Sequence, residues 1–200
     1  MQSVTGTRDT ILAVASHRFA ERGYAGTSLA EIAEEVGIRT PSLFHYFPSK
    51  LELYRAVLLD AFEDWFELIR ETTATPLDGW SQVEHILRTA FVFCEERPDF
   101  VRLARWEALD GGRVLADEMA SVLRPMFERA VDFLEREMNA GRVRQCDARR
   151  LVLTGYGAVL SYVSDAPLLG ALLGEDPLSA TAMAAEQEHI VDLFRRALAP

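Results

Sequence analysis

Cysteine is scarce in this chain of 200 residues, which contains only Cys94 and Cys146. Neither residue belongs to a Cys-x-x-Cys pair or to the Cys/His spacing of a zinc site, so neither a disulfide framework nor a structural metal is indicated. Isolated cysteines of this kind are typical of reduced thiols in the cytoplasm. We therefore expect a cytoplasmic protein that is stabilised by its hydrophobic core and needs no cofactor.

Long apolar runs are also rare. One stretch with few charges covers residues 151–174, where Asp165 is the only charged side chain. Its length is nominally sufficient to cross a bilayer, but Pro167 divides it in two. We expect a buried helix at a subunit interface that ends near Ser164, and no contact with a membrane. The N-terminus lacks the cationic region and apolar core of a signal peptide.

The common catalytic motifs are missing. The chain has no Gly-x-Ser-x-Gly, no P-loop and no His-Glu-x-x-His sequence, which are the usual marks of a hydrolase, a nucleotide-binding enzyme and a zinc protease. Glu186 and His189 form one Glu-x-x-His element, whereas a di-iron bundle needs two, together with further glutamates. A small helical enzyme or metal protein is therefore the weaker alternative, and we expect no catalytic residue.

The apolar residues, 49% of the chain, recur at intervals of three and four positions. This spacing places them on one face of an α-helix. No segment shows the sustained alternation of a half-buried strand. The sequence therefore predicts an all-α protein of about nine helices. Three of the apolar stripes are Ile11, Leu12, Ala15 and Phe19; Val83, Ile86, Leu87, Ala90 and Phe91; and Ile190, Leu193, Phe194 and Leu198.

The charges are distributed unevenly along the chain, whose net charge is −10. Residues 1–50 carry five basic and five acidic side chains, and the remaining 150 carry 16 basic and 26 acidic ones. The excess negative charge therefore lies outside the first fifty residues. A neutral N-terminal region can approach a polyanion that an acidic region would repel.

The first fifty residues contain the signals of a helix-turn-helix. Ser28 and Glu31 have the spacing of a capping box, which begins a helix, and Gly37 can end that helix in a left-handed conformation. Thr40 can cap a second short helix with Pro41 in its first turn. Two short helices joined by a glycine-containing turn form a helix-turn-helix, whose second helix enters the major groove of DNA.

The same region resembles the N-terminal domain of TetR-type transcriptional regulators. The resemblance extends from about residue 8 to residue 57 and is carried by FAERGYAGTS (19–28), IAEEVGI (32–38) and LFHYFPSK (43–50). It implies a DNA-binding domain at 5–65, with its motif at about 28–47, and a ligand-binding and dimerisation domain at 66–200. A homodimer of this family binds a palindromic operator, usually as a repressor, and releases it when a small molecule binds.

The resemblance also implies which residues contact DNA. Groups at the start of a helix can bind a phosphate, and the first residues of a recognition helix can reach base edges. The chain departs from the family pattern at Pro41, where glycine is frequent, and at Phe44, where tyrosine is usual. The residues expected to contact DNA are Thr27, Ser28, Arg39, Thr40, Pro41, Ser42, Phe44, His45, Tyr46 and Lys50, with Arg39, Thr40, Pro41 and Ser42 nearest the bases.

For the rest of the chain the resemblance implies an effector cavity and a dimer interface formed by helices at 147–164 and 181–197. The aromatic content favours a small, hydrophobic effector. The alternative is a similar helical protein that is regulated by protein contacts without a ligand. The residues expected to line the cavity are Phe66, Phe91, Trp106, Phe127 and Tyr156. Those expected at the dimer interface are Gly155, Ala158, Tyr162, Ala185, His189 and Leu193.

Overall fold

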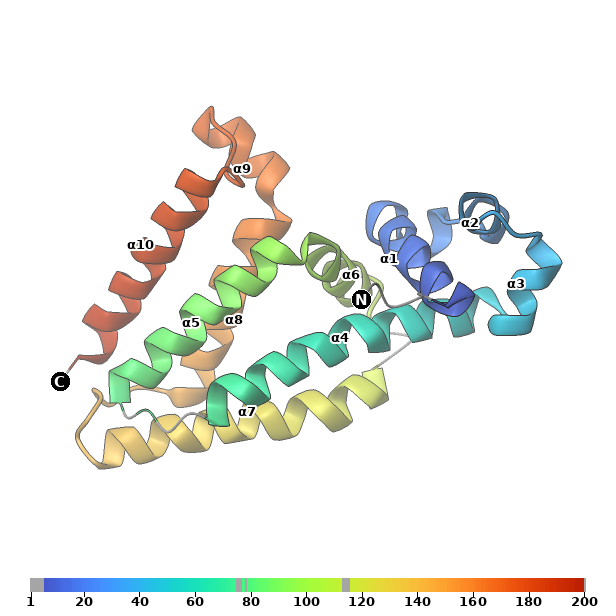
Figure 1. Cartoon of the computed structure of the whole chain (residues 1–200). Coiled ribbons are helices and arrows are strands. Elements are labelled where there is room, and N and C mark those ends of the chain that lie inside the picture. Colours follow the sequence, from blue (N-terminus) through green and yellow to red (C-terminus); the bar gives the residue numbers. More distant parts are fainter. Residues whose placement is uncertain (1–5, 75–76, 78, 113–115, 200) are drawn as a thin grey trace, which may run out of the picture. The chain divides into compact units, whose positions relative to one another are not determined.

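The computed structural model of the protein describes residues 6–74, 77, 79–112 and 116–199 (Figure 1), and within them it contains ten α-helices and no strand. The all-α prediction is confirmed, with one helix more than the nine expected. The helices are α1 (Thr7–Gly26), α2 (Leu29–Val36), α3 (Thr40–Tyr46), α4 (Lys50–Ala74), α5 (Gly79–Glu96), α6 (Pro98–Leu109), α7 (Ala116–Asn139), α8 (Ala148–Ser164), α9 (Ala166–Leu173) and α10 (Ala180–Leu198).

The chain forms two compact units. The N-terminal unit comprises the residues up to Asp64 together with Asp99–Ala116, and the C-terminal unit comprises Trp65–Pro98 and the residues from Asp117 onward. A single boundary after residue 65 was expected from the sequence. In the structure α6, which comes later in the chain, belongs to the unit that contains α1, α2 and α3. One reason is that the rings of Phe62 and Phe100 pack edge to face, 5.1 Å apart.

The N-terminal unit has a continuous apolar core. The stripe predicted on α1 is buried, with Ile11, Ala15 and Phe19 completely inaccessible to solvent. Ile32 of α2 and Leu43 of α3 are equally inaccessible. The burial of these side chains fixes which faces of α2 and α3 point inward and which point outward.

The turns around α2 and α3 follow local chemistry. The Ser28 side chain accepts a hydrogen bond from the N–H of Ala30, and Gly37 ends α2 at φ 80°. Both signals were predicted. The predicted cap of α3 is wrong by one residue, because Thr40 is already helical and Arg39 is the extended N-cap residue. Ser49 caps α4, and its side chain accepts from the N–H of Glu52 at 3.1 Å.

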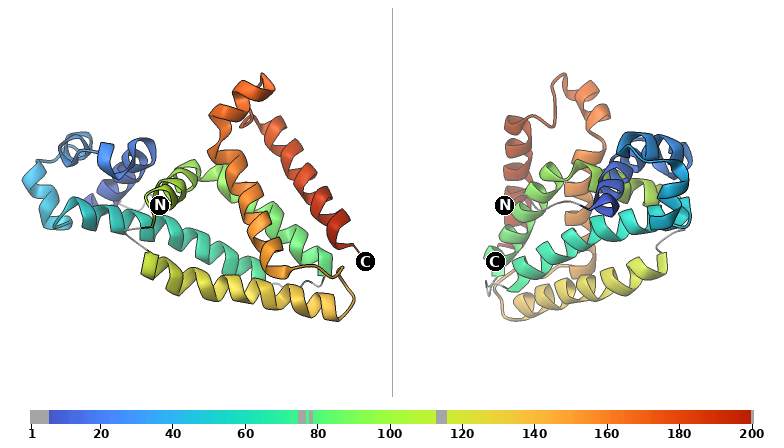
Figure 2. Two further views of the ribbon diagram at one scale, coloured as in Figure 1. Left: turned by 180° about the vertical axis from the view of Figure 1, so that it is seen from behind. Right: turned by 45° about the vertical axis from the view of Figure 1, so that its right-hand side comes forward.

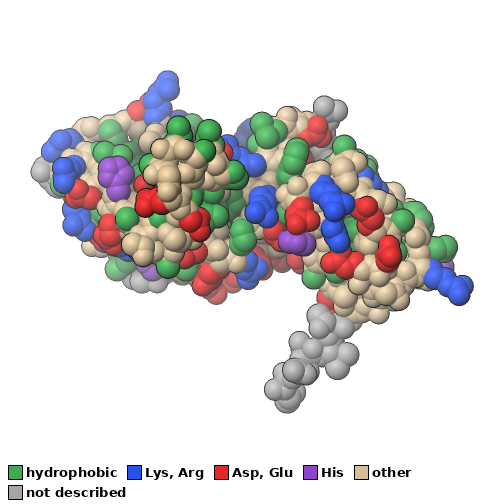
Figure 3. Space-filling view, turned by 90° about the horizontal axis from the view of Figure 1, so that it is seen from above, with side chains coloured by type: hydrophobic (Ala, Val, Ile, Leu, Met, Phe, Trp, Pro, Cys, Tyr) green, Lys and Arg blue, Asp and Glu red, His purple; other side chains and the backbone are tan. Residues whose placement is uncertain are grey.

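In the C-terminal unit α5 packs against both α8 and α10. Helix α9 joins α8 to α10, as both views of Figure 2 show. Asp147 caps α8, and Ser179 caps α10. Hydrophobic side chains also reach the surface, where they lie among acidic and basic ones (Figure 3).

The apolar stretch at 151–174 forms two helices. Helices α8 and α9 meet at an angle of 75°. Among the described residues no single helix is long and apolar enough to cross a membrane, and only this bent pair reaches that length and composition when the two are taken together.

Candidate nucleic-acid interface

Helix α3, which is expected to be the recognition helix, presents one polar and aromatic face to solvent. Leu43 is inaccessible and Phe47, just after the helix, is almost so, and both belong to the core. Phe44, His45 and Tyr46 are exposed on the other side. A helix with an anchored apolar face and an exposed opposite face can enter a groove without losing its core contacts.

The start of α3 adds a positive charge to this surface. Arg39 is exposed at the N-cap position, Pro41 is exposed in the first turn, and Thr40 and Ser42 are half-buried. Arginine can donate two hydrogen bonds to the O6 and N7 atoms of guanine, and serine can pair with several bases. The four residues predicted to lie nearest the bases are therefore consecutive at one end of one helix.

Thr27 and Ser28 lie in different surroundings although they are adjacent. The Thr27 side chain is only 4% exposed, and its hydroxyl donates to the carbonyl oxygens of Gly23 at 2.8 Å and Arg18 at 3.1 Å. This side chain connects the end of α1 to the start of α2. Ser28 is exposed, and its oxygen accepts from Ala30, which leaves the hydroxyl hydrogen available for a phosphate.

Lys50, the first residue of α4, is held over an aromatic ring. Its Nζ lies 4.6 Å from the centre of the Tyr24 ring, and Tyr24 packs in turn against Phe19 and Tyr54. Partial burial lowers the pKa of the Lys50 ammonium. The ammonium is thus oriented by a cation–π contact before any DNA binds.

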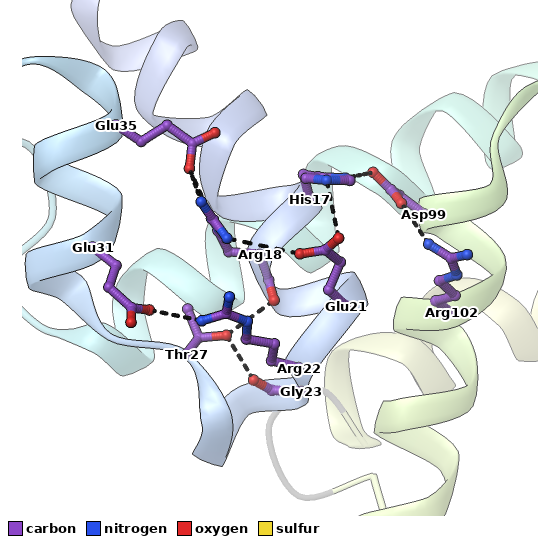
Figure 4. Close-up of polar contacts among 10 residues, drawn as sticks. All are labelled: His17, Arg18, Glu21, Arg22, Gly23, Thr27, Glu31, Glu35, Asp99 and Arg102. Atoms are coloured by element: carbon purple, nitrogen blue, oxygen red, sulfur yellow. Dashed lines mark hydrogen bonds and ion pairs between the residues drawn. The ribbon is translucent and has the colours of Figure 1, made fainter.

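Two ion pairs join α1 to α2 (Figure 4). The Arg18 Nη2 lies 2.6 Å from Glu35 Oε2, and the Arg22 Nη1 lies 3.1 Å from Glu31 Oε2. The hydrogen bond that Arg18 donates to the Glu35 carboxylate raises the pKa of Arg18. These contacts pair two carboxylates of α2 with cations of the same unit, so their charges are compensated before a phosphate backbone approaches.

These two ion pairs were not predicted, although the sequence contains a signal for them. Arg18 and Arg22 are four residues apart, as are Glu31 and Glu35. Each pair therefore lies on one face of its helix. The signal becomes specific only when it is known that the arginine face of α1 lies opposite the glutamate face of α2. That arrangement belongs to the tertiary structure and cannot be read from the spacing.

Comparison with known proteins agrees with this geometry. Residues 11–57 match the family model of bacterial regulatory proteins of the tetR family. Residues 81–194 match a second model, the tetracyclin repressor-like C-terminal domain. The chain belongs to the TetR family. It is therefore a DNA-binding transcriptional regulator, and the family supports the regulator hypothesis over the enzyme hypothesis.

Relatives of known name cover most of the chain. It is 28% identical to the HTH-type transcriptional regulator RutR of Escherichia coli K12 over 176 residues, which are 86% of this chain and 81% of RutR. Among solved structures, KstR2 of Mycobacterium tuberculosis has a TM-score of 0.81 at 19% identity and covers 99% of this chain and 97% of its own. The structure of AibR has a TM-score of 0.73 at 17% identity, and the match covers 94% of this chain and 97% of AibR.

The aromatic residues expected to line a TetR-type cavity do not share one unit. Phe66, Phe91, Phe127 and Tyr156 lie in the C-terminal unit, and Trp106 lies in the N-terminal unit, on α6. Phe91 is almost fully buried, whereas 56% of Tyr156 is exposed. Half-buried Phe127 lies under the guanidinium of Arg149, 5.5 Å from the ring centre.

The residues expected at the dimer interface also differ in exposure. Ala185, His189 and Leu193 of α10 are exposed, and Ala158 and Tyr162 of α8 are half-buried. Gly155 is buried in its own chain. A Cβ added there would lie 3.6 Å from the Phe194 ring and 3.8 Å from Leu87. The Gly155 position therefore faces α10 and α5 of the same protomer.

Proposed function

We propose that this regulator is a repressor that binds a palindromic operator as a homodimer and releases it when a small, largely apolar effector binds. The observation that carries the proposal is the exposed surface of α3, from Arg39 to Tyr46, on a helix whose opposite side is anchored by Leu43. Ser28 and Lys50 flank this helix with groups suited to phosphate.

Exposed apolar side chains on α8 and α10 support the dimer. Leu153 and Tyr156 of α8 are more than half exposed, and so is Leu193 of α10. Exposed apolar side chains that lie together are typical of a protein interface. Two copies would cover them, and a two-fold axis would match the symmetry of a palindromic site.

The fold neighbours suggest which effectors to test first. AibR was solved in complex with isovaleryl coenzyme A and operator DNA, so a protein of this fold holds a molecule with a small apolar acyl group. The aromatic residues of the C-terminal unit suit such a group. Neutral apolar molecules test the proposed effector class directly. Isovaleryl coenzyme A, with coenzyme A alone as the control, tests the alternative that the acyl group is bound as part of a large, charged carrier.

The test is selection of bound fragments from random duplex DNA by the purified protein. The expected product is an inverted repeat whose half-sites are separated by about one helical turn, or a multiple of it. Fragments without two-fold symmetry would contradict the homodimer. Selection is then repeated with each candidate effector, and loss of the fragments identifies an inducer.

Failure of every apolar compound to release the operator would contradict the effector and favour regulation by protein contacts. The sign of regulation is checked separately, by placing the selected site downstream of a promoter in a reporter cell. The proposal predicts lower transcription when the protein is present. Higher transcription would make it an activator.

A further inference from the structure

Helix α1 changes direction three residues before it ends. Gly23 has φ 67° and ψ 178°, which is not a helical conformation and is accessible mainly to glycine. Where a helix is interrupted, the carbonyls of its last turn lose their regular N–H partners. The kink therefore needs outside donors, and it lies directly before Thr27 and Ser28, which begin the helix-turn-helix.

Trp106 of α6 supplies one of these donors. Its Nε1–H donates to the carbonyl oxygen of Ala20 at 3.1 Å. The indole ring also lies against Gly23, because a Cβ built on that residue would come within 3.1 Å of Cδ2 and Cε3 of the ring. One side chain thus satisfies a carbonyl of the interrupted turn and occupies the space beside the glycine.

The residue after Trp106 contacts a second helix of the same unit. Tyr54 of α4 donates from its hydroxyl to Glu107 at 3.3 Å, and both residues are buried. The Tyr54 ring packs against Phe19 at 4.9 Å and against Tyr24 at 5.1 Å, residues on either side of the kink. Further along, Asp99 of α6 accepts from His17 of α1 at 3.2 Å (Figure 4).

We infer that Trp106 is a positioning residue for operator recognition: it holds the kink of α1 so that Thr27, Ser28 and α2 begin in the orientation that α3 needs. The donor to Ala20 and the ring against Gly23 lie on the N-terminal side of the turn. The Thr27 hydroxyl, bonded to Gly23 and Arg18, lies on the other side. The turn is therefore fixed from both sides.

The test is Trp106→Phe in the full chain, because phenylalanine keeps an aromatic ring beside Gly23 while removing the N–H donor together with part of the indole ring. Trp80→Phe is the matched control, since Trp80 Nε1 donates to Glu84 at 2.7 Å in the C-terminal unit. The measurement is the affinity for the selected operator and for a scrambled duplex at one salt concentration. Stoichiometric titration gives the active fraction, and circular dichroism gives the helix content.

We expect Trp106→Phe to weaken operator binding about five- to tenfold, which is the effect of one lost hydrogen bond. The affinity for the scrambled duplex, the active fraction and the helix content should all stay unchanged. Trp80→Phe should bind the operator as the wild type does. Equal operator affinity in Trp106→Phe and wild type would overturn the inference. So would a loss explained entirely by a smaller active fraction, because that is a structural effect alone.

A second variant tests the glycine. Gly23→Ala places a methyl group against the Trp106 ring and forces a positive φ on an L-residue. We expect Gly23→Ala to lose more operator affinity than Trp106→Phe does. In the double variant, the fold-loss of affinity should be smaller than the product of the fold-losses of the two single variants. Independent, multiplicative effects would show that Trp106 does not act through Gly23.

Discussion

Individual side chains determine how the N-terminal unit presents charge to DNA. Arg18 and Arg22 are engaged by glutamates of α2, and Arg8 lies over the Phe47 ring. Arg39 directly precedes α3 in the sequence, and Lys50 follows it by four residues. A small set of cations, each in a defined place, makes the contribution of one of them measurable.

Lys50 permits a chemical test because it is the only lysine of the chain. Acetylation of amines changes Lys50 and the N-terminal amine and leaves every arginine charged. If Lys50 contacts one phosphate in each subunit, acetylation should flatten the slope of log K against log salt by about 0.9 per contact, or about 1.8 per dimer. The slope is measured by titrating operator binding at several salt concentrations, with acetylated Lys50→Arg protein as the control. An unchanged slope would show that Lys50 only stacks on Tyr24.

The buried carboxylate of Glu137 links stability to pH. Hydrogen bonds from Arg142, at 2.5 and 2.6 Å, and from the N–H of Gly79, at 2.7 Å, lower the pKa of Glu137. A carboxyl group whose pKa is lowered by folding stabilises the fold above its unfolded pKa of about 4.3, and this contribution is lost as pH falls through the folded value.

Glu137→Gln should therefore lower the free energy of unfolding by about 2 kcal/mol at neutral pH, and the difference from wild type should shrink below about pH 4. Urea denaturation at pH 7 and at lower pH measures this difference in the free energy of unfolding. Glu135→Gln, at an exposed position of the same helix, is the control and should change little at either pH. A Glu137→Gln deficit of the same size at all pH values would show that the charge of Glu137 is not the cause.

At the scale of helices, the turn between α2 and α3 depends on one glycine. Gly37 has φ 80°, and a Cβ there would meet nothing within 4 Å. Gly37→Ala should therefore destabilise the protein through backbone conformation alone, by about 1 kcal/mol. Gly37→Asn should recover part of this loss, because asparagine tolerates the left-handed region. Thermal unfolding compares the three proteins, and an alanine variant as stable as wild type would contradict the explanation.

Helix boundaries were predictable where the signal is local. Ser28 and Gly37 act through neighbouring backbone groups, and both were located from sequence. The cap of α3 was misplaced because Thr40 is the better capping residue by type, whereas the backbone places Arg39 there.

Contacts between helices were not predictable in the same way. Phe44, His45 and Tyr46 of α3 were expected to contact DNA, and all three are exposed. The contact of Trp106 with Ala20 and Gly23 was not foreseen, because 86 residues separate its hydrogen-bonded partners along the chain. Sequence spacing describes the face of one helix, whereas the partner of that face depends on the whole fold.

At the scale of the whole molecule, the proposed dimer makes α8 and α10 the surfaces to alter. Tyr156→Arg and Leu193→Arg place charges on side chains that are more than half exposed, so each variant should fold. Both should be monomeric at micromolar concentration and bind the operator much more weakly. Sedimentation and operator titration measure these two properties. Gly155→Arg is unsuitable because that position contacts Phe194 of its own chain.

Leu109→Arg is the matched control for these variants, because Leu109 is an exposed leucine of α6 in the N-terminal unit. It should remain dimeric. Dimers that persist in both Tyr156→Arg and Leu193→Arg would place the interface elsewhere.

The central claim is that the exposed start of α3 reads DNA sequence, and Arg39 tests it most directly. The measurement is the ratio of affinities for the selected operator and a scrambled duplex, at one salt concentration, for wild type, Arg39→Ala and Arg150→Ala. Arg150 is an exposed arginine of α8 in the C-terminal unit and serves as the control. The account predicts that Arg39→Ala lowers this ratio about tenfold or more, while Arg150→Ala leaves it unchanged. An unchanged ratio in Arg39→Ala would contradict the account.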